Sequence, residues 1–380
     1  MKILSLFANV GFGEFYLKDL GHEVVVANEL LQDRVDFYKK FYPDHKDVIC
    51  GDISKQGVQD KLVKACDNHG GVDIIIATPP CQGMSIANAK KDTEDPRNTL
   101  IVHAMNVFNR VRPKYMLIEN VPQMAKTYIF YKKKLYNIID FIKSRLPENF
   151  ECIYETMNGK YCGSPQSRSR SICLISKKGS WRHPKEKTAI TTVRETISHL
   201  CSLESGECSS IKWHFSPKHN ERHIDWMKNT PTGDTAFNNK EDHFPYVLEN
   251  GKKRRIYGFS TTYKRMDWNS PAPTVTMTNG SISSQNNVHP GNKNPDGTYS
   301  DARVLSIREV LLLCGLPEGC LDQFARLQKD GSFKYEYNQS FIRKVLGELF
   351  LPKMAKYIIS TIPSNDVDVE DNSRQLKFDF

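Results

Sequence analysis

Short apolar runs alternate with longer amphipathic segments over the first 180 residues of the chain. Apolar runs of four to eight residues, rich in Val and Ile and bounded by turn residues, are typical of buried strands, whereas apolar residues spaced three and four apart indicate helices. The pattern predicts strands at residues 2–7, 23–27, 47–50, 73–77, 114–118, 151–156 and 171–176. It predicts helices at about 13–20, 31–41, 55–68, 99–111 and 131–146.

Strands that alternate with helices of this length are typical of a doubly wound, mostly parallel sheet, because each helix can cross over to the next parallel strand. The sequence therefore predicts an α/β protein with a Rossmann-like core in residues 1–182.

The pattern changes between about 180 and 300, where Pro, Gly, Asn, Ser and Thr accumulate and apolar periodicity fades. Basic and aromatic residues interleave at 252–259 (KKRRIYGF) and 261–268 (TTYKRMDW). We therefore expect a second, smaller, loop-rich domain over residues 183–300.

Helical patterns return at 303–316 and 341–361, which predicts that residues 301–362 pack back on the first domain. The last stretch, 363–380, is acidic and polar until its final hydrophobic residues, and we expect it to be a disordered tail.

Composition narrows the class of protein. The chain has 380 residues, 39% hydrophobic and 26% charged, which permits a large buried core and two domains. No apolar run approaches the roughly 20 residues that a membrane-spanning helix needs, so we expect a cytoplasmic protein without membrane contact. The ten cysteines form no CxxC pair and no zinc-type cluster with His, which predicts reduced thiols and no metal site. A formal net charge of +9 suits a polyanionic partner such as DNA or RNA.

Three predicted strand ends carry groups suited to a nucleotide-like cofactor. The first strand leads into FANVGFGE (7–14), where glycines let a backbone approach a ligand closely. Glu29 follows the second strand, where a carboxylate can accept both ribose hydroxyls, and Asp52 follows the third, within reach of an adenine amino group. An incomplete G-x-G-x-x-G favours S-adenosylmethionine over a dinucleotide. The alternative is that Glu29 and Asp52 only cap the next helices.

The fourth and fifth strand ends carry reactive groups. Cys81 stands in TPPCQGMS, directly after two prolines that restrict the backbone, and Glu119 stands in IENVP. Ligands bind outside the carboxyl ends of such strands, so these side chains are candidates for chemistry on an electron-poor ring. Arg168 and Arg170, in SPQSRSR, share one face by strand alternation and could bind a base carbonyl, a phosphate or a carboxylate.

These motifs resemble those of the cytosine-5 DNA methyltransferase family, of bacterial or phage restriction-modification type. Six motifs follow one another in the family's order over nearly the whole chain: SLFANVGFGEFYL, TPPCQGMS, IENVP, SPQSRSR, RVLSIREVLLLCGLPE and VLGELFLP. The resemblance implies a Rossmann-like, S-adenosylmethionine-dependent core with a target-recognition domain at residues 183–300, the end of which is 263–291.

The resemblance also implies residue roles. Cys81 attacks carbon-6 of a cytosine that has been flipped out of the duplex, Glu119 binds or protonates ring nitrogen-3, and Arg170 contacts the base oxygen with Arg168 beside it. Carbon-5 then takes a methyl group from S-adenosylmethionine. The cofactor is implied to contact Phe7, Ala8, Gly11, Glu29, Asp52, Ile53, Pro79, Leu100, Glu348 and Leu349.

The sequence departs from the family pattern at four positions. Asn9 and Phe12 replace two glycines of the first motif, which predicts weaker cofactor binding. Met84 stands where Phe is commoner, and Glu348 where many members have Asn.

The implied partner is double-stranded DNA, bound by a nucleoid-associated monomer that is paired with a cognate restriction endonuclease. The final residues 375–380 (QLKFDF) resemble a peptide that binds a sliding clamp.

Three other functions stay open. They are a tRNA cytosine-5 methyltransferase, a nucleotide-dependent oxidoreductase in which Cys81 is structural, and a catalytically silent DNA-binding relative, suggested by Asn9 and Phe12.

Overall fold

The structure is a computed structural model of the chain, and it describes residues 1–45, 47–80, 99–240 and 242–363. The predicted nucleophile Cys81, Met84, the peptide 375–380 and nearly all of the expected disordered tail 363–380 lie outside the described residues.

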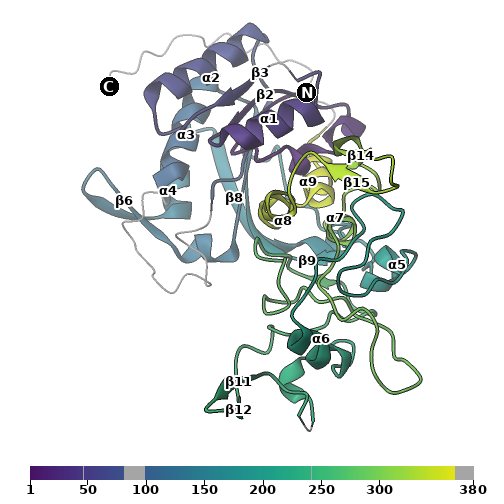
Figure 1. The fold of residues 1–380 in the computed structure, drawn as a ribbon. Helices are drawn as coiled ribbons and strands as arrows, with labels where there is room; N and C mark the ends of the chain where they lie inside the picture. Colours follow the sequence, from purple (N-terminus) through teal and green to yellow (C-terminus); the bar gives the residue numbers. More distant parts are fainter. Residues whose placement is uncertain (46, 81–98, 241, 364–380) are drawn as a thin grey trace.

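Within the described residues, a seven-stranded sheet forms the centre of the larger lobe, in the order β3-β2-β1-β4-β5-β10-β8 (Figure 1). Its strands are β1 (Lys2–Leu6), β2 (Glu23–Glu29), β3 (Asp47–Cys50), β4 (Ile74–Ala77), β5 (Tyr115–Asn120), β8 (Phe150–Asn158) and β10 (Ser169–Lys177). β10 is antiparallel to both of its neighbours, and the pairs among β1 to β5 are parallel. The predicted α/β fold with a mostly parallel sheet is therefore confirmed.

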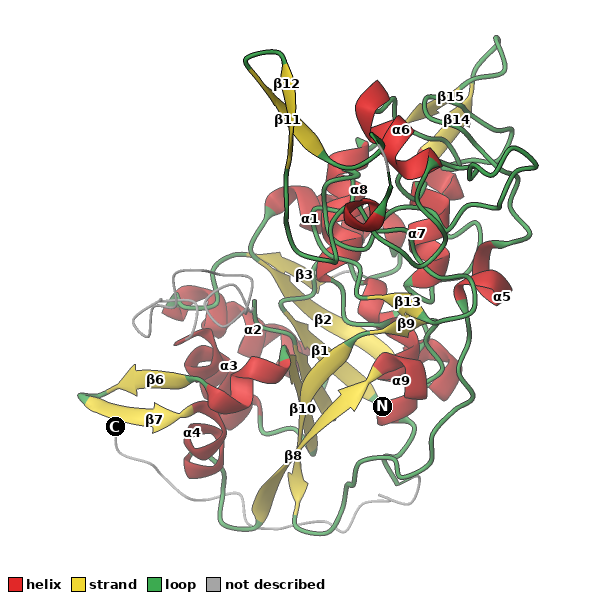
Figure 2. Ribbon diagram, turned by 90° about the horizontal axis from the view of Figure 1, so that it is seen from below, coloured by secondary structure: helices red, strands yellow, loops and turns green. Residues whose placement is uncertain are grey.

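Alternate residues of the strands enter two different cores. Tyr115 and Leu117 of β5 join one core, whereas Met116 and Ile118 join the other. The first core is covered by α1 (Gln32–Phe41), α7 (Ile307–Leu313), α8 (Gln339–Glu348) and α9 (Pro352–Ile359). The second is covered by α2 (Gln56–Asn68), α3 (Leu100–Val111) and α4 (Ile138–Ser144). Figure 2 shows the two sets of helices on opposite sides of the sheet.

Three predicted helices differ in the structure. Residues 13–20 form two 3-10 turns, Phe12–Glu14 and Leu17–Leu20, in place of an α-helix. Most of the predicted helix 131–146 is wrong, because a β-hairpin occupies its first part and α4 begins only at Ile138. The predicted helix 341–361 is two helices, since Pro352 has no N–H to continue α8 and instead begins α9.

Residues 183–300 divide between two clusters. The short helix α5 (Val193–Ile197) and Trp213 pack in the first core of the larger lobe. A smaller cluster gathers Trp226, Met227, Ala236, Ile282, Val288, Ala302 and Val304, around α6 (Glu221–Lys228). The exposed hairpin of β11 (Tyr246–Glu249) and β12 (Lys252–Arg255) lies at the far end of this smaller lobe (Figure 1). We propose that the smaller cluster is the core of the expected second domain.

A buried group of charges fixes the chain where it returns from the smaller lobe. The Arg303 guanidinium donates to Asp301 Oδ1 at 2.7 Å and to Glu309 Oε2 at 2.8 Å, and all three side chains are at most 1% exposed. Glu309 also accepts from the backbone N of Ser306, closing a capping box at the start of α7. Each buried charge therefore has a partner of opposite sign.

Among the described residues, no helix has the length and apolar character needed to cross a membrane. No group of three or more potential metal ligands occurs in that part of the chain either.

Candidate active site

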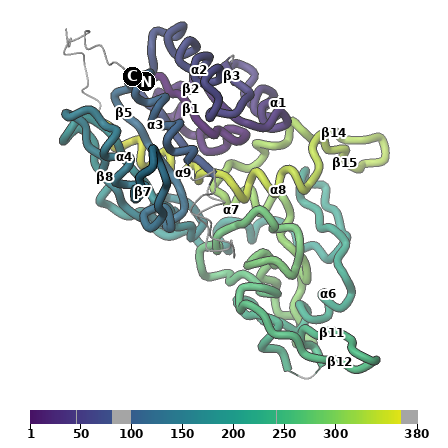
Figure 3. The backbone as a smooth tube through the Cα atoms, turned by 90° about the vertical axis from the view of Figure 1, so that its left-hand side faces the viewer, coloured from purple at the N-terminus to yellow at the C-terminus, as the bar shows by residue number. Residues whose placement is uncertain are grey.

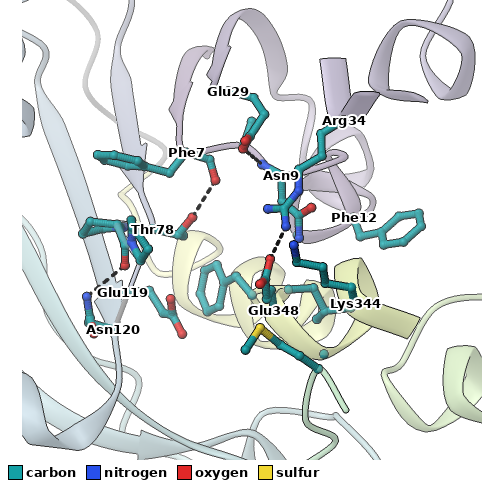
Figure 4. Close-up of a pocket in the computed structure, with 18 of the residues that line it drawn as sticks. Phe7, Asn9, Phe12, Glu29, Arg34, Thr78, Glu119, Asn120, Lys344 and Glu348 are labelled. Atoms are coloured by element: carbon teal, nitrogen blue, oxygen red, sulfur yellow. Dashed lines mark hydrogen bonds and ion pairs between the residues drawn. The ribbon is translucent and has the colours of Figure 1, made fainter. Parts of the chain in front are cut away.

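A cavity of about 820 Å³ lies at the carboxyl ends of β1, β2, β4 and β5, closed on its other side by α8 and by residues 274–278 (Figure 4). Ligands of open α/β sheets bind at this edge. Most of the residues predicted from the sequence line it, namely Phe7, Ala8, Glu29, Asp52, Ile53, Pro79, Leu100, Glu119, Arg168, Arg170, Glu348 and Leu349. The structure thus brings these twelve predicted positions around one cavity.

Gly11 is the predicted site residue that the structure places behind the cavity wall. Its carbonyl accepts a hydrogen bond from Tyr42 Oη at 2.9 Å, and its φ is +81°. A Cβ at this position would lie 2.6 Å from the Tyr42 ring and 2.7 Å from the Tyr38 ring. A glycine is therefore needed here both for the turn and for packing against α1.

The two departures in the first motif have structural explanations. Asn9 keeps a positive φ of 52°, which Asn adopts more readily than most non-glycine residues. Its backbone N donates to Glu29 Oε2 at 2.9 Å, and its Nδ2 donates to the Val345 carbonyl at 3.0 Å. Phe12 points away from the centre of the cavity (Figure 4) and packs edge-on against Phe37. Asn9 therefore ties the first turn to α8, and Phe12 contributes mainly to the core.

Glu29 presents a nearly buried carboxylate, 6% exposed, to the cavity. Burial raises the pKa of Glu29, and the nearby Arg34 and backbone N–H groups act against that rise. Arg34, from α1, forms an ion pair with Glu348 at the end of α8. This pair joins the two sides of the cavity next to Glu29 (Figure 4).

Three buried oxygens of the cavity lining accept no hydrogen bond from the described residues: Asn9 Oδ1, Glu14 Oε1 and Thr276 Oγ1. S-adenosylmethionine carries donors that suit such acceptors, in its ammonium, ribose and adenine amino groups, and a carboxylate that suits the cations Arg34 and Lys344 of the lining. The residues present therefore fit this cofactor.

The second half of the cavity holds the predicted acid. Glu119 is the penultimate residue of β5, is 8% exposed, and its Oε1 lies 2.7 Å from Arg170 Nε. Burial raises the pKa of Glu119, while Arg170 and Arg168 act in the opposite direction. Asn120 Nδ2 donates to the Pro79 carbonyl at 3.0 Å, which links the ends of β4 and β5. The lining extends to Pro80, the last described residue before Cys81.

The two arginines have different surroundings. Arg168 is 4% exposed, and it donates from Nη1 to the Val275 carbonyl at 2.8 Å and from Nη2 to the Gly347 carbonyl at 2.9 Å. Val275 is 107 residues from Arg168 along the chain, and Gly347 is 179 residues from it. Arg168 thus joins three parts of the cavity wall, whereas Arg170 faces Glu119.

Sequence reasoning missed many of the lining residues, and those with polar or charged groups of interest include Glu14, Arg34, Thr276 and Lys344. Glu14 is buried, accepts from Tyr38 Oη, and burial raises its pKa to about 7. Glu14 is the only charged residue of the first motif, and this was an available signal. Arg34 and Lys344 look like ordinary helix surface charges in the sequence, and nothing there distinguished them.

Comparison with known proteins agrees with this geometry. Residues 1–364 match the family described as C-5 cytosine-specific DNA methylase. The chain is 40% identical to the Type II methyltransferase M1.HgaI of Avibacterium volantium over 365 residues, covering 94% of this chain and 97% of the relative. It is 27% identical to the Type II methyltransferase M1.HphI of Haemophilus parahaemolyticus over 323 residues, covering 84% and 78% of the two chains.

Solved structures share the fold at low sequence identity. The S. pombe Dnmt2 methyltransferase has a TM-score of 0.58 at 16% identity, covering 95% of this chain and 98% of that chain. The Spodoptera frugiperda DNMT2 mutant has a TM-score of 0.59 at 15% identity, covering 95% and 99%.

Proposed function

The chain belongs to the C-5 cytosine-specific DNA methylase family, and from this we propose that it methylates carbon-5 of a flipped-out cytosine in a short DNA sequence, as the modification enzyme of a restriction-modification system. It is a methyltransferase that uses S-adenosylmethionine, and DNA is its expected substrate. The observation that carries the proposal is the buried Glu119–Arg170 pair in the same cavity as the cofactor positions.

The residues of this cavity suit the proposed reaction. Burial keeps a proton on Glu119 to a higher pH than usual, so this carboxyl can donate a hydrogen bond to ring nitrogen-3 of cytosine. Arg170 holds the Glu119 carboxyl by its Nε, and its remaining guanidinium donors suit the base oxygen. Arg168 positions the wall behind them through two backbone carbonyls.

Withdrawal of electrons at nitrogen-3 favours addition of a thiolate at carbon-6. In the proposed sequence of steps, Cys81 forms a bond to carbon-6 and the displaced electron pair makes carbon-5 nucleophilic. S-adenosylmethionine, held by the residues of the cavity, would supply the methyl group to carbon-5, and its S–CH3 bond would break to leave S-adenosylhomocysteine. A base then removes the carbon-5 proton, Cys81 leaves as a thiolate, and 5-methylcytosine is released.

The relatives' names support the pairing with an endonuclease, because both relatives compared above are called Type II methyltransferases. We also propose that the enzyme acts as a monomer at the nucleoid. We propose further that residues 375–380 contact a sliding clamp. Deletion of residues 375–380 should weaken binding to a purified clamp, and unchanged affinity would contradict that contact.

The test is genomic bisulfite sequencing in a host that lacks cytosine methylation. We expect the wild type and the control Cys208→Ala, whose thiol is exposed and lies outside the cavity lining, to protect cytosines in one short sequence context, and Cys81→Ala to protect none. If the wild type protects no context, the proposal for DNA is wrong. Bisulfite sequencing of tRNA and titration with S-adenosylmethionine would then distinguish an RNA methyltransferase from a catalytically silent relative.

A further inference from the structure

A β-hairpin projects from the larger lobe shortly after β5, the strand that carries Glu119. Its strands are β6 (Tyr128–Tyr131) and β7 (Lys134–Asn137), and a 3-10 turn, Pro122–Lys126, connects it to β5. One face is anchored: Ile129 is 1% exposed, and the rings of Tyr131 and Tyr136 pack edge-on against Phe141 of α4. The hairpin is therefore held at a defined place relative to the site.

The turn of this hairpin is built from unusual residues. Lys132 and Lys133 have φ of 47° and 63°, the left-handed values of a type I′ turn. The other exposed two-residue hairpin, β11–β12, has Asn250 and Gly251 at the same positions, with φ of 51° and 77°. Asn-Gly is the favoured pair, whereas a bulky residue at positive φ costs roughly 1–2 kcal/mol. The Lys132–Lys133 pair is therefore not explained by the stability of the turn.

The hairpin carries a concentrated positive charge. Residues 121–139 contain four lysines and neither Asp nor Glu. In the part of the chain that the structure describes, no ion pair engages Lys126, Lys132, Lys133 or Lys134. The second face of the hairpin is bare and apolar, with Tyr128, Phe130 and Leu135 exposed by 47%, 57% and 55%. Such a surface suits a polyanion with an apolar edge, as the sugar–phosphate backbone has.

Its position is suited to the DNA that would deliver a base to Glu119. Figure 3 looks onto the side of the molecule that presents β7 on the larger lobe and β11–β12 at the far end of the smaller lobe. Strands of four residues extend about 13 Å, so the lysine tip lies about 13 Å from the root of the hairpin, a distance equal to the length of about four base pairs of duplex DNA.

We propose that the β6–β7 hairpin is a DNA-binding arm outside residues 183–300, whose lysine tip contacts backbone phosphates that flank the methylated cytosine. The inference rests on the proposed function, because DNA is the partner to which it commits. Phe130 and Tyr128 pack against the sugar edge, while the tip supplies a sequence-independent, salt-dependent part of the affinity.

The test replaces the tip by the turn that the molecule uses elsewhere. Lys132→Asn/Lys133→Gly removes two charges but installs the favoured type I′ pair, so the melting temperature should stay equal or rise. The matched control Lys177→Gln/Lys178→Gln removes two exposed charges at the opposite edge of the sheet. Dissociation constants for a duplex that contains the methylated sequence are measured by fluorescence anisotropy from 50 to 200 mM salt.

Loss of two phosphate contacts lowers the slope of log affinity against log salt by about 1.8. The variant's deficit relative to wild type should therefore shrink by about tenfold between 50 and 200 mM salt. A third variant, Phe130→Thr, should weaken binding without changing the slope. Equal affinity and slope in wild type and Lys132→Asn/Lys133→Gly would overturn the proposal, and so would the same change in the control. If sedimentation shows a dimer that Phe130→Thr dissociates, the apolar face joins two copies of the chain and its assignment to DNA is wrong.

The binding readout is independent of catalysis. A wild type that binds DNA but methylates none would overturn the proposed function alone, and the salt slopes would still decide on the arm. A wild type that does not bind DNA would overturn both.

Discussion

Gly347, in the last turn of α8, lies directly against the backbone of residues 276–277. A Cβ at Gly347 would lie 2.5 Å from Met277 N and from Thr276 O, whereas ordinary contacts begin at 3.4 Å. Gly347→Ala must therefore push α8 and this segment apart by about 1 Å. The same shift strains the hydrogen bond from Arg168 Nη2 to the Gly347 carbonyl.

The expected cost follows from these two effects. Overpacking costs about 1–3 kcal/mol, and loss of a hydrogen bond from a buried charged donor costs about 1.5–3 kcal/mol. We expect Gly347→Ala to lower the free energy of unfolding by about 3 kcal/mol and the melting temperature by about 4 °C. Because the shifted segments are cavity walls, the dissociation constant of S-adenosylmethionine should rise about tenfold, equivalent to about 1.4 kcal/mol.

Calorimetry of unfolding and isothermal titration with S-adenosylmethionine measure both effects. Gly57→Ala is the matched control, because a Cβ at Gly57 meets nothing within 4 Å. This control should be neutral or stabilising by about 1 kcal/mol or less. If Gly347→Ala melts and binds cofactor as the wild type does, the close approach of α8 to residues 276–277 is not what shapes the cavity.

Three further predictions concern titratable groups. Burial raises the pKa of Glu14 from its ordinary 4.5 to about 7. Between these pH values the native state therefore holds a proton that the unfolded chain releases. The free energy of unfolding of the wild type should fall by about 3 kcal/mol as the pH rises from 4.5 to 7. Denaturant titrations of Glu14→Gln should lack that fall, and parallel pH curves for the two proteins would contradict the assignment. Glu119→Gln should reduce kcat about 10²- to 10⁴-fold. Because the pKa of Glu119 is raised, the single-turnover rate of the wild type should persist to a higher pH than an ordinary carboxyl allows and then decline. If Glu119→Gln shows the same decline with pH, the decline belongs to another group. Asp301→Asn leaves the buried Arg303 short of one counter-charge and should lower the free energy of unfolding by about 3 kcal/mol in urea, and a change under about 0.5 kcal/mol would argue against the buried network.

The sequence predicted the parts of the fold that depend on local pattern. Runs such as DIIIA and KYMLI are long, β-branched or apolar, and bounded by polar residues, so β4 and β5 are where the pattern predicts them. The β6–β7 hairpin escaped prediction because its turn is Lys-Lys, which lacks the glycine or asparagine that marks such turns. Pro352 carried the information that α8 and α9 are separate, but the amphipathic pattern continues across it.

The same distinction holds at the site. Glu29, Asp52 and Glu119 lie at or next to the carboxyl ends of their strands, and parallel strands of one sheet bring these ends to one edge, so the sequence could place them together. Arg34 and Thr276 reach the cavity through packing between segments that are far apart in the chain, and no local pattern encodes such packing. Arg168 bonds to backbone carbonyls, whereas Arg170 pairs with the Glu119 carboxylate, and only the assembled fold defines which of these groups lies near each guanidinium.

The cavity has walls from opposite ends of the chain: Asn9 is bonded to Val345, and Arg34 is paired with Glu348. A ribosome adds about 5–20 residues per second, so the first wall leaves it roughly 15–70 seconds before α8 does. During that interval the nascent sheet has its strand-end carboxylates but only half a cofactor pocket. With S-adenosylmethionine in the proposed position, we expect fragments that end before α8 not to bind the methyl donor in this cavity, so that its binding reports a polypeptide made through α8.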